Sequence, residues 1–80
     1  MIYYTYIIRS VKDNKLYIGH TNDLKKRLSQ HLQGKVPSTK NRKPLKLVYF
    51  EGCLNLKKAI SREHYFKTGF GRRFLNSRLS

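Results

Sequence analysis

The sequence predicts an α+β fold, similar to an α/β sandwich, in which three strands form a small sheet flanked by helices. Two observations support it. Three segments rich in tyrosine, isoleucine and other branched or aromatic residues have the composition of β-strands, and apolar residues at helical spacing follow two of them. The chain has 80 residues with no internal repeat or long linker, so we expect one domain spanning residues 1–80 with a modest core.

The first expected strand runs from Ile2 to Arg9 and carries apolar residues on both faces, which is typical of a strand covered on both sides. Residues 12–15 (KDNK) have turn chemistry, and residues 16–19 then return as the partner strand. The two segments predict an antiparallel hairpin that ends at Gly19.

The first expected helix spans residues 24–33, and either Asn22 or Asp23 can cap its start. Arg27 and His31 lie one turn apart at the edge of its apolar stripe, so we expect both to be half-buried. The stripe itself comprises Leu24, Leu28 and Leu32. Residues 35–44 have no periodicity and contain two prolines, which predicts a basic loop.

Residues 45–51 form the third expected strand, which Gly52 ends. Asn55 can cap a second helix that runs to about Thr68. We expect residues 69–71 (GFG) to break this helix and residues 72–79 to form a short basic one. The buried stripe of the second helix comprises Leu56, Ala59, Ile60 and Phe66.

The charge of the chain predicts a polyanionic partner. Eighteen Lys and Arg against four Asp and Glu give a formal charge of +14, although a merely solvated basic surface is an alternative. Neither helix has the wide aromatic or leucine face that binds a membrane, and no apolar run approaches the roughly 20 residues of a spanning helix. We expect contacts with nucleic-acid phosphates at Lys35, Lys40, Arg42, Lys43 and Lys46.

The single cysteine, Cys53, cannot form an internal disulfide and fits a reducing compartment. Together with the absence of a signal-like start, this predicts a soluble, cytoplasmic protein.

Glu63 is the carboxylate best suited to bind a metal, because it alone of the four projects from an apolar helix face. One carboxylate with phosphate oxygens and water suits a single Mg²⁺ or Mn²⁺, whereas a two-metal site wants several acids. An ion pair with Lys67, Arg62 or Arg27 is the alternative, and spacing does not decide between them. A zinc site is not expected, because paired metal-ligand spacing is missing among His20, His31, Cys53 and His64.

Tyr6 and Tyr17 lie on neighbouring expected strands, so their hydroxyls could converge on one spot. A phenol of pKa about 10 is a poor base unless a metal-bound water or nearby cations favour the phenolate, and this basic chain supplies cations. We favour Tyr6 as the base. For His31 the alternative role is a hydrogen bond to a strand carbonyl.

Together, Tyr4-Thr5-Tyr6, the Tyr17-Ile18-Gly19 tripeptide after residues 7–16, and then Arg27, His31 and Glu63 resemble the GIY-YIG nuclease domain. The resemblance covers nearly the whole chain. It is closest to short stand-alone bacterial members related to the nuclease module of the excision-repair C subunit. It implies a three-stranded antiparallel sheet flanked by helices, in agreement with the elements above.

The resemblance also implies roles. Tyr6 and Tyr17 match the two motif tyrosines, one of which activates water, and Arg27 matches the arginine that steadies the attacked phosphate. Glu63 matches the metal ligand. His31 matches a position that orients the nucleophile or assists proton transfer.

Three further residues are assigned to the nucleic acid: His20, Lys67 and Asn76. His20 stands where some relatives carry a lysine near the phosphate, and Asn76 matches a late asparagine that contacts the site. Tyr4 departs from the family pattern because it replaces a glycine. Larger relatives carry a separate DNA-binding domain that this chain lacks, so substrate choice comes from the domain itself or from a protein partner.

These features predict a divalent-metal-dependent endonuclease that acts on nicked, branched or damaged DNA. The alternative is a nucleic-acid-binding module of the same fold that does not cut. A third possibility, a module whose aromatic strands dock a protein, is disfavoured by the charge.

Overall fold

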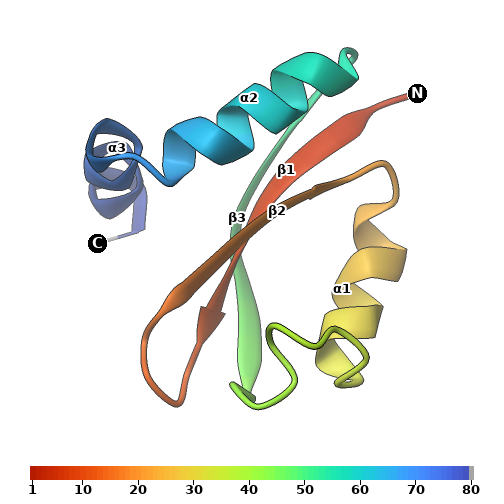
Figure 1. Cartoon of the computed structure of the whole chain (residues 1–80), viewed down its shortest axis with the longest axis vertical. Helices are drawn as coiled ribbons and strands as arrows, with labels where there is room; N and C mark the ends of the chain where they lie inside the picture. Colours follow the sequence, from red (N-terminus) through yellow and green to blue (C-terminus); the bar gives the residue numbers. More distant parts are fainter. Residues whose placement is uncertain (80) are drawn as a thin grey trace.

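The structure, a computed structural model, describes residues 1–79 (Figure 1). Its elements in chain order are β1 (Tyr3–Ser10), β2 (Leu16–Thr21), α1 (Leu24–Leu32), β3 (Leu45–Cys53), α2 (Leu56–Phe66) and α3 (Gly69–Leu79). The strands form one sheet in the order β2-β1-β3, and β1 pairs antiparallel with both neighbours. The predicted α+β fold with a three-stranded antiparallel sheet is therefore confirmed.

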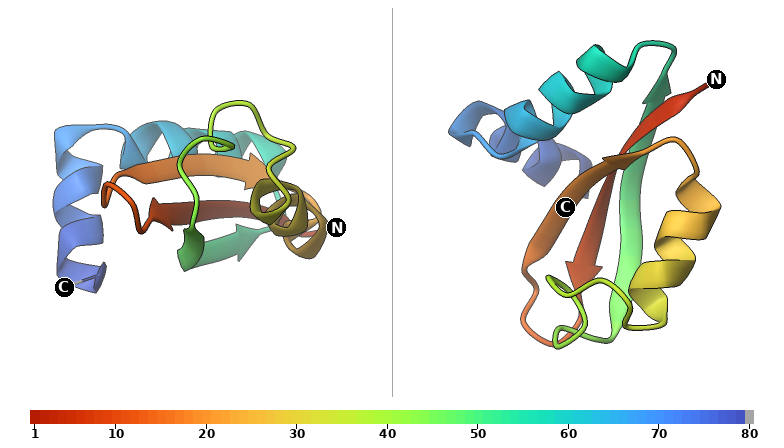
Figure 2. Two further views of the ribbon diagram at one scale, coloured as in Figure 1. Left: turned by 90° about the horizontal axis from the view of Figure 1, so that it is seen from below. Right: turned by 45° about the vertical axis from the view of Figure 1, so that its right-hand side comes forward.

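The two faces of the sheet are covered by different helices, with α1 on one side and α2 and α3 on the other (Figures 1 and 2). Side chains of β1 alternate between these faces. The Thr5 hydroxyl donates a hydrogen bond of 2.9 Å to the Ala59 carbonyl of α2, whereas the Tyr6 hydroxyl contacts His31 of α1. An apolar cluster of Ile7, Ile18, Phe66 and Leu75 lies on the α2 and α3 side. Ile8 and Val36 are further buried apolar residues.

Both predicted helix caps are present. The Asp23 side chain accepts a hydrogen bond of 3.0 Å from the Lys26 N–H, and the Asn55 side chain accepts one of 3.2 Å from the Lys58 N–H. Each satisfies a backbone donor that the first turn of a helix leaves without a partner.

Two glycines that were expected to interrupt elements lie inside them. The prediction that residues 69–71 break the chain before a helix at 72 is wrong, because α3 begins at Gly69. Gly71 is buried, and a Cβ there would lie 2.0 Å from the Tyr65 carbonyl oxygen, so glycine allows α3 to pack closely on the end of α2. Gly52 does not end β3 either: it pairs with Tyr4, and a Cβ there would lie 2.8 Å from Cγ2 of Ile2.

The burial of the helices also differs from the expected stripes. Leu32 is 48 % exposed and Leu56 is 43 % exposed, so neither belongs to the core. His31 is completely buried rather than half-buried, because α1 turns this side chain, and not Leu32, toward the sheet. Among the residues described, no helix combines the length and apolarity needed to cross a bilayer.

Candidate active site

A buried chain of hydrogen bonds joins the sheet, α1 and the basic loop. The Tyr6 hydroxyl lies 3.0 Å from His31 Nε2, and His31 Nδ1 lies 2.8 Å from Thr39 Oγ1. Arg27 Nε donates a longer bond of 3.4 Å to the Tyr6 oxygen. Tyr6, His31 and Thr39 are all buried, so the three side chains satisfy one another away from water.

The direction of these hydrogen bonds follows from the guanidinium group, which can only donate. The Tyr6 oxygen accepts from Arg27, and among the residues described His31 Nε2 is the acceptor within reach of the Tyr6 O–H, which therefore donates to it. Burial, and second the charge of Arg27, lowers the pKa of His31 to about 4, so its imidazole is neutral at pH 7. Its proton then lies on Nδ1 and is donated to Thr39. The alternative role for His31, a hydrogen bond to a strand carbonyl, is therefore wrong.

Gly19 makes room for the Tyr6 phenol. It pairs with Tyr6 across β1 and β2, and a Cβ at this position would lie 2.6 Å from the Tyr6 hydroxyl oxygen and 3.2 Å from Cε2 of Tyr17. The expected hairpin is present, but β2 continues through Gly19 to Thr21. The glycine therefore serves the close approach of a phenol rather than the end of the strand.

Tyr17 lies beside this cluster on the same face of the sheet. It pairs with Ile8, its ring centroid lies 6.3 Å from that of Tyr6, and the His31 ring lies 5.0 Å away. The pKa of Arg27 is raised, first by its hydrogen bond to Tyr6 and to a smaller degree by Tyr17, while burial opposes the shift. The guanidinium therefore contacts one phenol of a closely packed pair.

The two phenols differ in access to solvent. Tyr6 is 1 % exposed, whereas Tyr17 is partly exposed. Burial raises the pKa of Tyr6 more than the hydrogen bond from Arg27 lowers it, so this phenol stays protonated at neutral pH. Both properties disfavour the expectation that Tyr6 is the base.

Glu63 reaches the same region from α2. Its Oε1 lies 2.5 Å from His20 Nδ1, and its Oε2 accepts a hydrogen bond of 2.8 Å from Lys67 Nζ. Burial raises the pKa of Glu63, but the bonds from Lys67 and His20 together outweigh it, so the pKa is lowered and the carboxylate is charged at pH 7. His20, which binds this carboxylate, follows Gly19 on β2, so Glu63 lies at the strand that also carries Tyr17.

The ion pair expected as an alternative role of Glu63 is thus present with Lys67. The other two candidate partners are bound elsewhere: Arg62 donates to Glu51 at 2.8 Å, and Arg27 donates to Tyr6. The side chain of Glu63 is 16 % exposed and that of Lys67 is 50 % exposed. Lys67 can therefore leave the carboxylate at little cost when another cation or a phosphate arrives.

The donor atoms fit a single hard cation better than zinc. In residues 1–79, no group of three His, Cys, Asp or Glu side chains could hold a metal ion together. A charged, mostly buried carboxylate is the one strong oxygen ligand at this site, and Mg²⁺ commonly takes its remaining ligands from water and phosphate. Glu63 is therefore the residue of this region whose chemistry suits a divalent metal ion.

The expected nucleic-acid contacts fall into two groups. Lys35, Lys40 and Lys43 are exposed on the loop between α1 and β3, and Lys46 is exposed at the start of β3. Arg42 is partly buried: its carbonyl accepts a bond of 2.6 Å from the Ser10 hydroxyl, and its Nε lies 3.8 Å from an Asp13 carboxylate oxygen.

Three other expected contacts lie elsewhere. His20 and Lys67 are both bound to Glu63. Asn76 is exposed on α3, where it lines cavities with residues of the β1–β2 hairpin such as Asn14 and Leu16, and not with the phenols.

Thr39 is the member of the cluster that sequence reasoning missed. It lies in an aperiodic loop whose composition is polar and basic, and nothing in the spacing marks it as buried. The pairing of its hydroxyl with His31 ties the loop to the phenols.

Comparison with known families agrees with this fold. The GIY-YIG catalytic domain profile matches residues 2–76, nearly the whole chain. The chain belongs to the GIY-YIG family, a family of nuclease domains that generally use a divalent metal ion.

Its relatives are small bacterial proteins of the UPF0213 group. A UPF0213 protein of Clostridium perfringens is 48 % identical over 65 residues, which cover 80 % of this chain and 69 % of that protein. The UPF0213 protein YazA of Bacillus subtilis is 39 % identical, with 81 % and 66 % covered. The chain thus spans about two thirds of the length of these relatives.

A solved structure has the same fold. The solution NMR structure of a UPF0213 protein from Bacillus halodurans matches 96 % of this chain and 84 % of that one, with a TM-score of 0.59 and 30 % identity.

Proposed function

We propose that the protein is a divalent-metal-dependent endonuclease that hydrolyses a phosphodiester bond, in nicked, branched or damaged DNA. The observation that carries the proposal is the contact of the Arg27 guanidinium with a buried phenol that lies beside a second one, close to the ionised Glu63 carboxylate that is bound by His20, the neighbour of Gly19 on β2. Membership of a nuclease family and the charge of +14 support it.

Arg27 holds the scissile phosphate and stabilises the charge that grows on its oxygens during attack. Tyr6 acts as a positioning residue, because its buried hydroxyl fixes the guanidinium through Nε and is itself fixed by His31. His31 in turn is held by Thr39, so it orients the phenol and stays neutral.

Tyr17 takes the proton of the attacking water in this proposal, in place of Tyr6. Its phenol is partly exposed and packs beside Tyr6, the phenol that Arg27 contacts. The water oxygen bonds to phosphorus as the bond from phosphorus to the leaving strand breaks. The water proton passes to the Tyr17 oxygen while the hydroxyl proton of Tyr17 passes to solvent, to which this phenol is partly open, and the leaving oxygen takes a proton from solvent.

Glu63 is the residue that holds the metal ion. A bound Mg²⁺ or Mn²⁺ supplies positive charge that polarises the phosphate and acidifies water. His20 and Lys67 keep the carboxylate ionised and oriented in the free protein, and Lys67 is exposed enough to turn toward a substrate phosphate.

A nucleic-acid-binding module that does not cut is the second candidate. One observation favours it: both oxygens of Glu63 already have hydrogen-bond partners, so the carboxylate can serve an ion pair alone.

The substitution Glu63→Gln separates the two candidates, with Glu51→Gln as the matched control because Glu51 pairs with Arg62 instead. We expect wild type and Glu51→Gln to nick plasmid and cleave branched DNA in Mg²⁺ or Mn²⁺ but not in EDTA, and Glu63→Gln to be inactive yet still bind DNA. Since Lys67 is half-exposed, Glu63→Gln should change the free energy of unfolding by less than about 1 kcal/mol.

Two results would contradict the proposal. Cutting by Glu63→Gln at the wild-type rate would remove the metal-ligand assignment. Tight DNA binding by wild type without cleavage of any of these substrates would favour the binding module.

A further inference from the structure

A groove lies at the hairpin end of the sheet, where α3 passes the turn between β1 and β2. Two cavities of about 340 and 520 Å³ meet there and share Asn14, Leu16 and Asn76 in their linings. We call this the hairpin groove, and its polar lining residues are Arg9, Asn14, Lys15, Arg42, Arg72 and Asn76.

The lining of the hairpin groove is strongly positive. Four of its side chains are basic, and none of the residues that line the two cavities is acidic. Arg9 also stands directly opposite Lys46 in the β1–β3 ladder, a like-charge pair that destabilises the free sheet. Concave surfaces of one charge concentrate ligands of the opposite charge.

Arg42 has unused hydrogen-bonding capacity. Among the residues described, its Nε is a buried side-chain nitrogen without a hydrogen-bond partner, and the Asp13 carboxylate at 3.8 Å is beyond hydrogen-bond distance. The Arg42 side chain as a whole is 26 % exposed and lines the groove, so a ligand oxygen can approach the guanidinium there while Nε stays covered. Guanidinium groups bind phosphate oxygens with paired N–H donors, and the amides of Asn14 and Asn76 add neutral donors.

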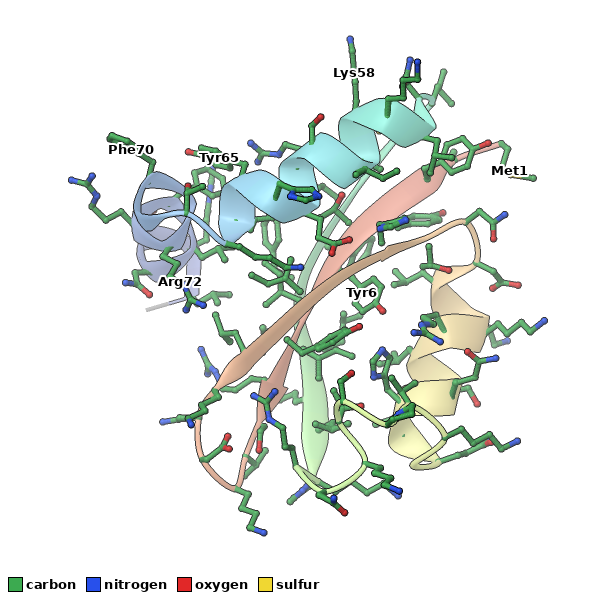
Figure 3. The ribbon with its side chains drawn as sticks, in the orientation of Figure 1. Met1, Tyr6, Lys58, Tyr65, Phe70 and Arg72 are labelled. Carbon is green, nitrogen blue, oxygen red and sulfur yellow. The ribbon has the colours of Figure 1, made fainter. Side chains whose placement is uncertain are left out.

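The groove is separate from the site around Tyr6. Arg9 and Leu16 pair in the sheet and face α3, whereas Tyr6 faces α1. Figure 3 shows Arg72 on α3, well apart from Tyr6. The loop of residues 35–44 links the two places, because its Thr39 holds His31 while its Arg42 lines the groove.

We propose that the hairpin groove binds the backbone of the nucleic acid at a phosphate other than the one that Arg27 holds. The proposal rests in part on the proposed function, since it extends the path of the same substrate over the loop lysines to α3. A polyanionic strand fits better than an anionic membrane, because the groove is concave and lacks the wide apolar face that inserts between lipids.

The test compares two adjacent arginines of α3. Arg72 lines the hairpin groove, whereas Arg73 lies outside it with its guanidinium 4.9 Å from the Phe70 ring centroid. Both are exposed, so Arg72→Ala and Arg73→Ala remove the same charge from the same helix. Affinity for a labelled DNA duplex is measured in EDTA, where no cutting occurs, at salt concentrations from 50 to 200 mM.

We expect Arg72→Ala to weaken binding about five- to tenfold at the lower salt concentration and to reduce the slope of log K against log salt by about 0.9, the loss of one phosphate contact. Arg73→Ala should change both quantities much less. Equal effects of the two variants would show a general charge effect and overturn the proposal. So would an Arg72-dependent affinity for anionic phospholipid vesicles without a matching effect on DNA.

This outcome is independent of catalysis. Suppose that wild type binds DNA but never cuts it, and that Arg72→Ala still binds more weakly than Arg73→Ala. The proposed DNA contact in the hairpin groove is then supported, and the proposed endonuclease activity is contradicted. If wild type cuts and the two variants bind alike, the groove alone fails.

Discussion

The two faces of the sheet are buried in different ways, although the same strand supplies both. Toward α2 and α3, Ile7 and Ile18 pack with Phe66 and Leu75 in an apolar cluster. Toward α1, Tyr6 is just as deeply buried but contacts the polar atoms of His31 and Arg27.

The two faces therefore differ in how strictly they fix the positions of their side chains. Apolar burial is non-directional and contributes roughly 25 cal/mol per Å², so the α2 and α3 face tolerates small shifts. A buried polar network is favourable only while every donor and acceptor keeps its partner, so the α1 face accepts few arrangements. We therefore expect substitutions on the core face to change the free energy of unfolding alone. Substitutions on the α1 face should change chemistry, and they should also lower stability where they leave a buried partner unsatisfied.

The largest effect is expected at Tyr17. Replacement by Phe keeps the ring and removes the hydroxyl that takes the proton, so the single-turnover cleavage rate should fall by roughly 10²- to 10⁴-fold. The thermal melt should hardly change, because Tyr17 is partly exposed.

Tyr6→Phe is the matched comparison for Tyr17→Phe. It leaves His31 Nε2 buried without its donor, so it should cost about 1–3 kcal/mol of unfolding free energy and less rate than Tyr17→Phe. A larger loss of cleavage rate in Tyr6→Phe than in Tyr17→Phe would indicate that Tyr6, and not Tyr17, is the base.

Phe66 should give the next largest effect, on stability alone. It is completely buried, and Phe66→Ala should lower the free energy of unfolding by roughly 3–5 kcal/mol in urea denaturation. Phe70 on α3 is 71 % exposed, so Phe70→Ala should stay within about 0.5 kcal/mol of wild type. Similar losses for both phenylalanines would contradict the assignment of the core to the α2 and α3 face.

The smallest expected effect is the loss of stability at acidic pH that results from protonation of His31. Its pKa is about 4 in the folded protein against 6.5 unfolded, so the unfolded state binds the extra proton between these values. The contribution of the neutral imidazole is complete above pH 6.5 and is lost as the pH falls toward 4, by at most about 3 kcal/mol. Urea denaturation at several pH values should show this loss in wild type.

The control for this pH dependence is His31→Gln, which cannot titrate. Its stability should be lower overall but flatter between pH 6.5 and 4. An equally steep curve in the variant would assign the acid sensitivity to other groups. Glu63 affects the free energy of unfolding in a more acidic pH range. Because its pKa is lowered in the folded protein, its stabilising contribution is lost only as the pH falls below the ordinary value of 4.5.

Local chemistry explains which parts of the fold were predictable. The caps at Asp23 and Asn55 depend on residues within one helical turn, and both are present. The nearness of Tyr6 and Tyr17 followed from antiparallel pairing of two adjacent segments.

Features that depend on distant partners were not predictable. Local rules predict that Gly52 and Gly71 end or interrupt an element. In the fold, Gly52 instead makes room for Ile2, far along the chain, and Gly71 makes room for the end of α2. The rotation of α1 that buries His31 and exposes Leu32 is set by its contact with the sheet and by Thr39, which lies in a loop without periodicity.

The central position of β1 also constrains how this protein can evolve. Insertion or deletion of one residue within Tyr3–Ser10 would shift the strand by one position and exchange its faces, sending Tyr6 into the apolar core and Ile7 toward His31. Unless the extra residue is absorbed in a β-bulge, like the irregularity between Ile7 and Ile8, such a change disrupts the site and the apolar cluster together. Length variation among descendants should therefore concentrate in the turn at residues 11–15 and the loop at 35–44, with the eight positions of β1 inherited as a unit.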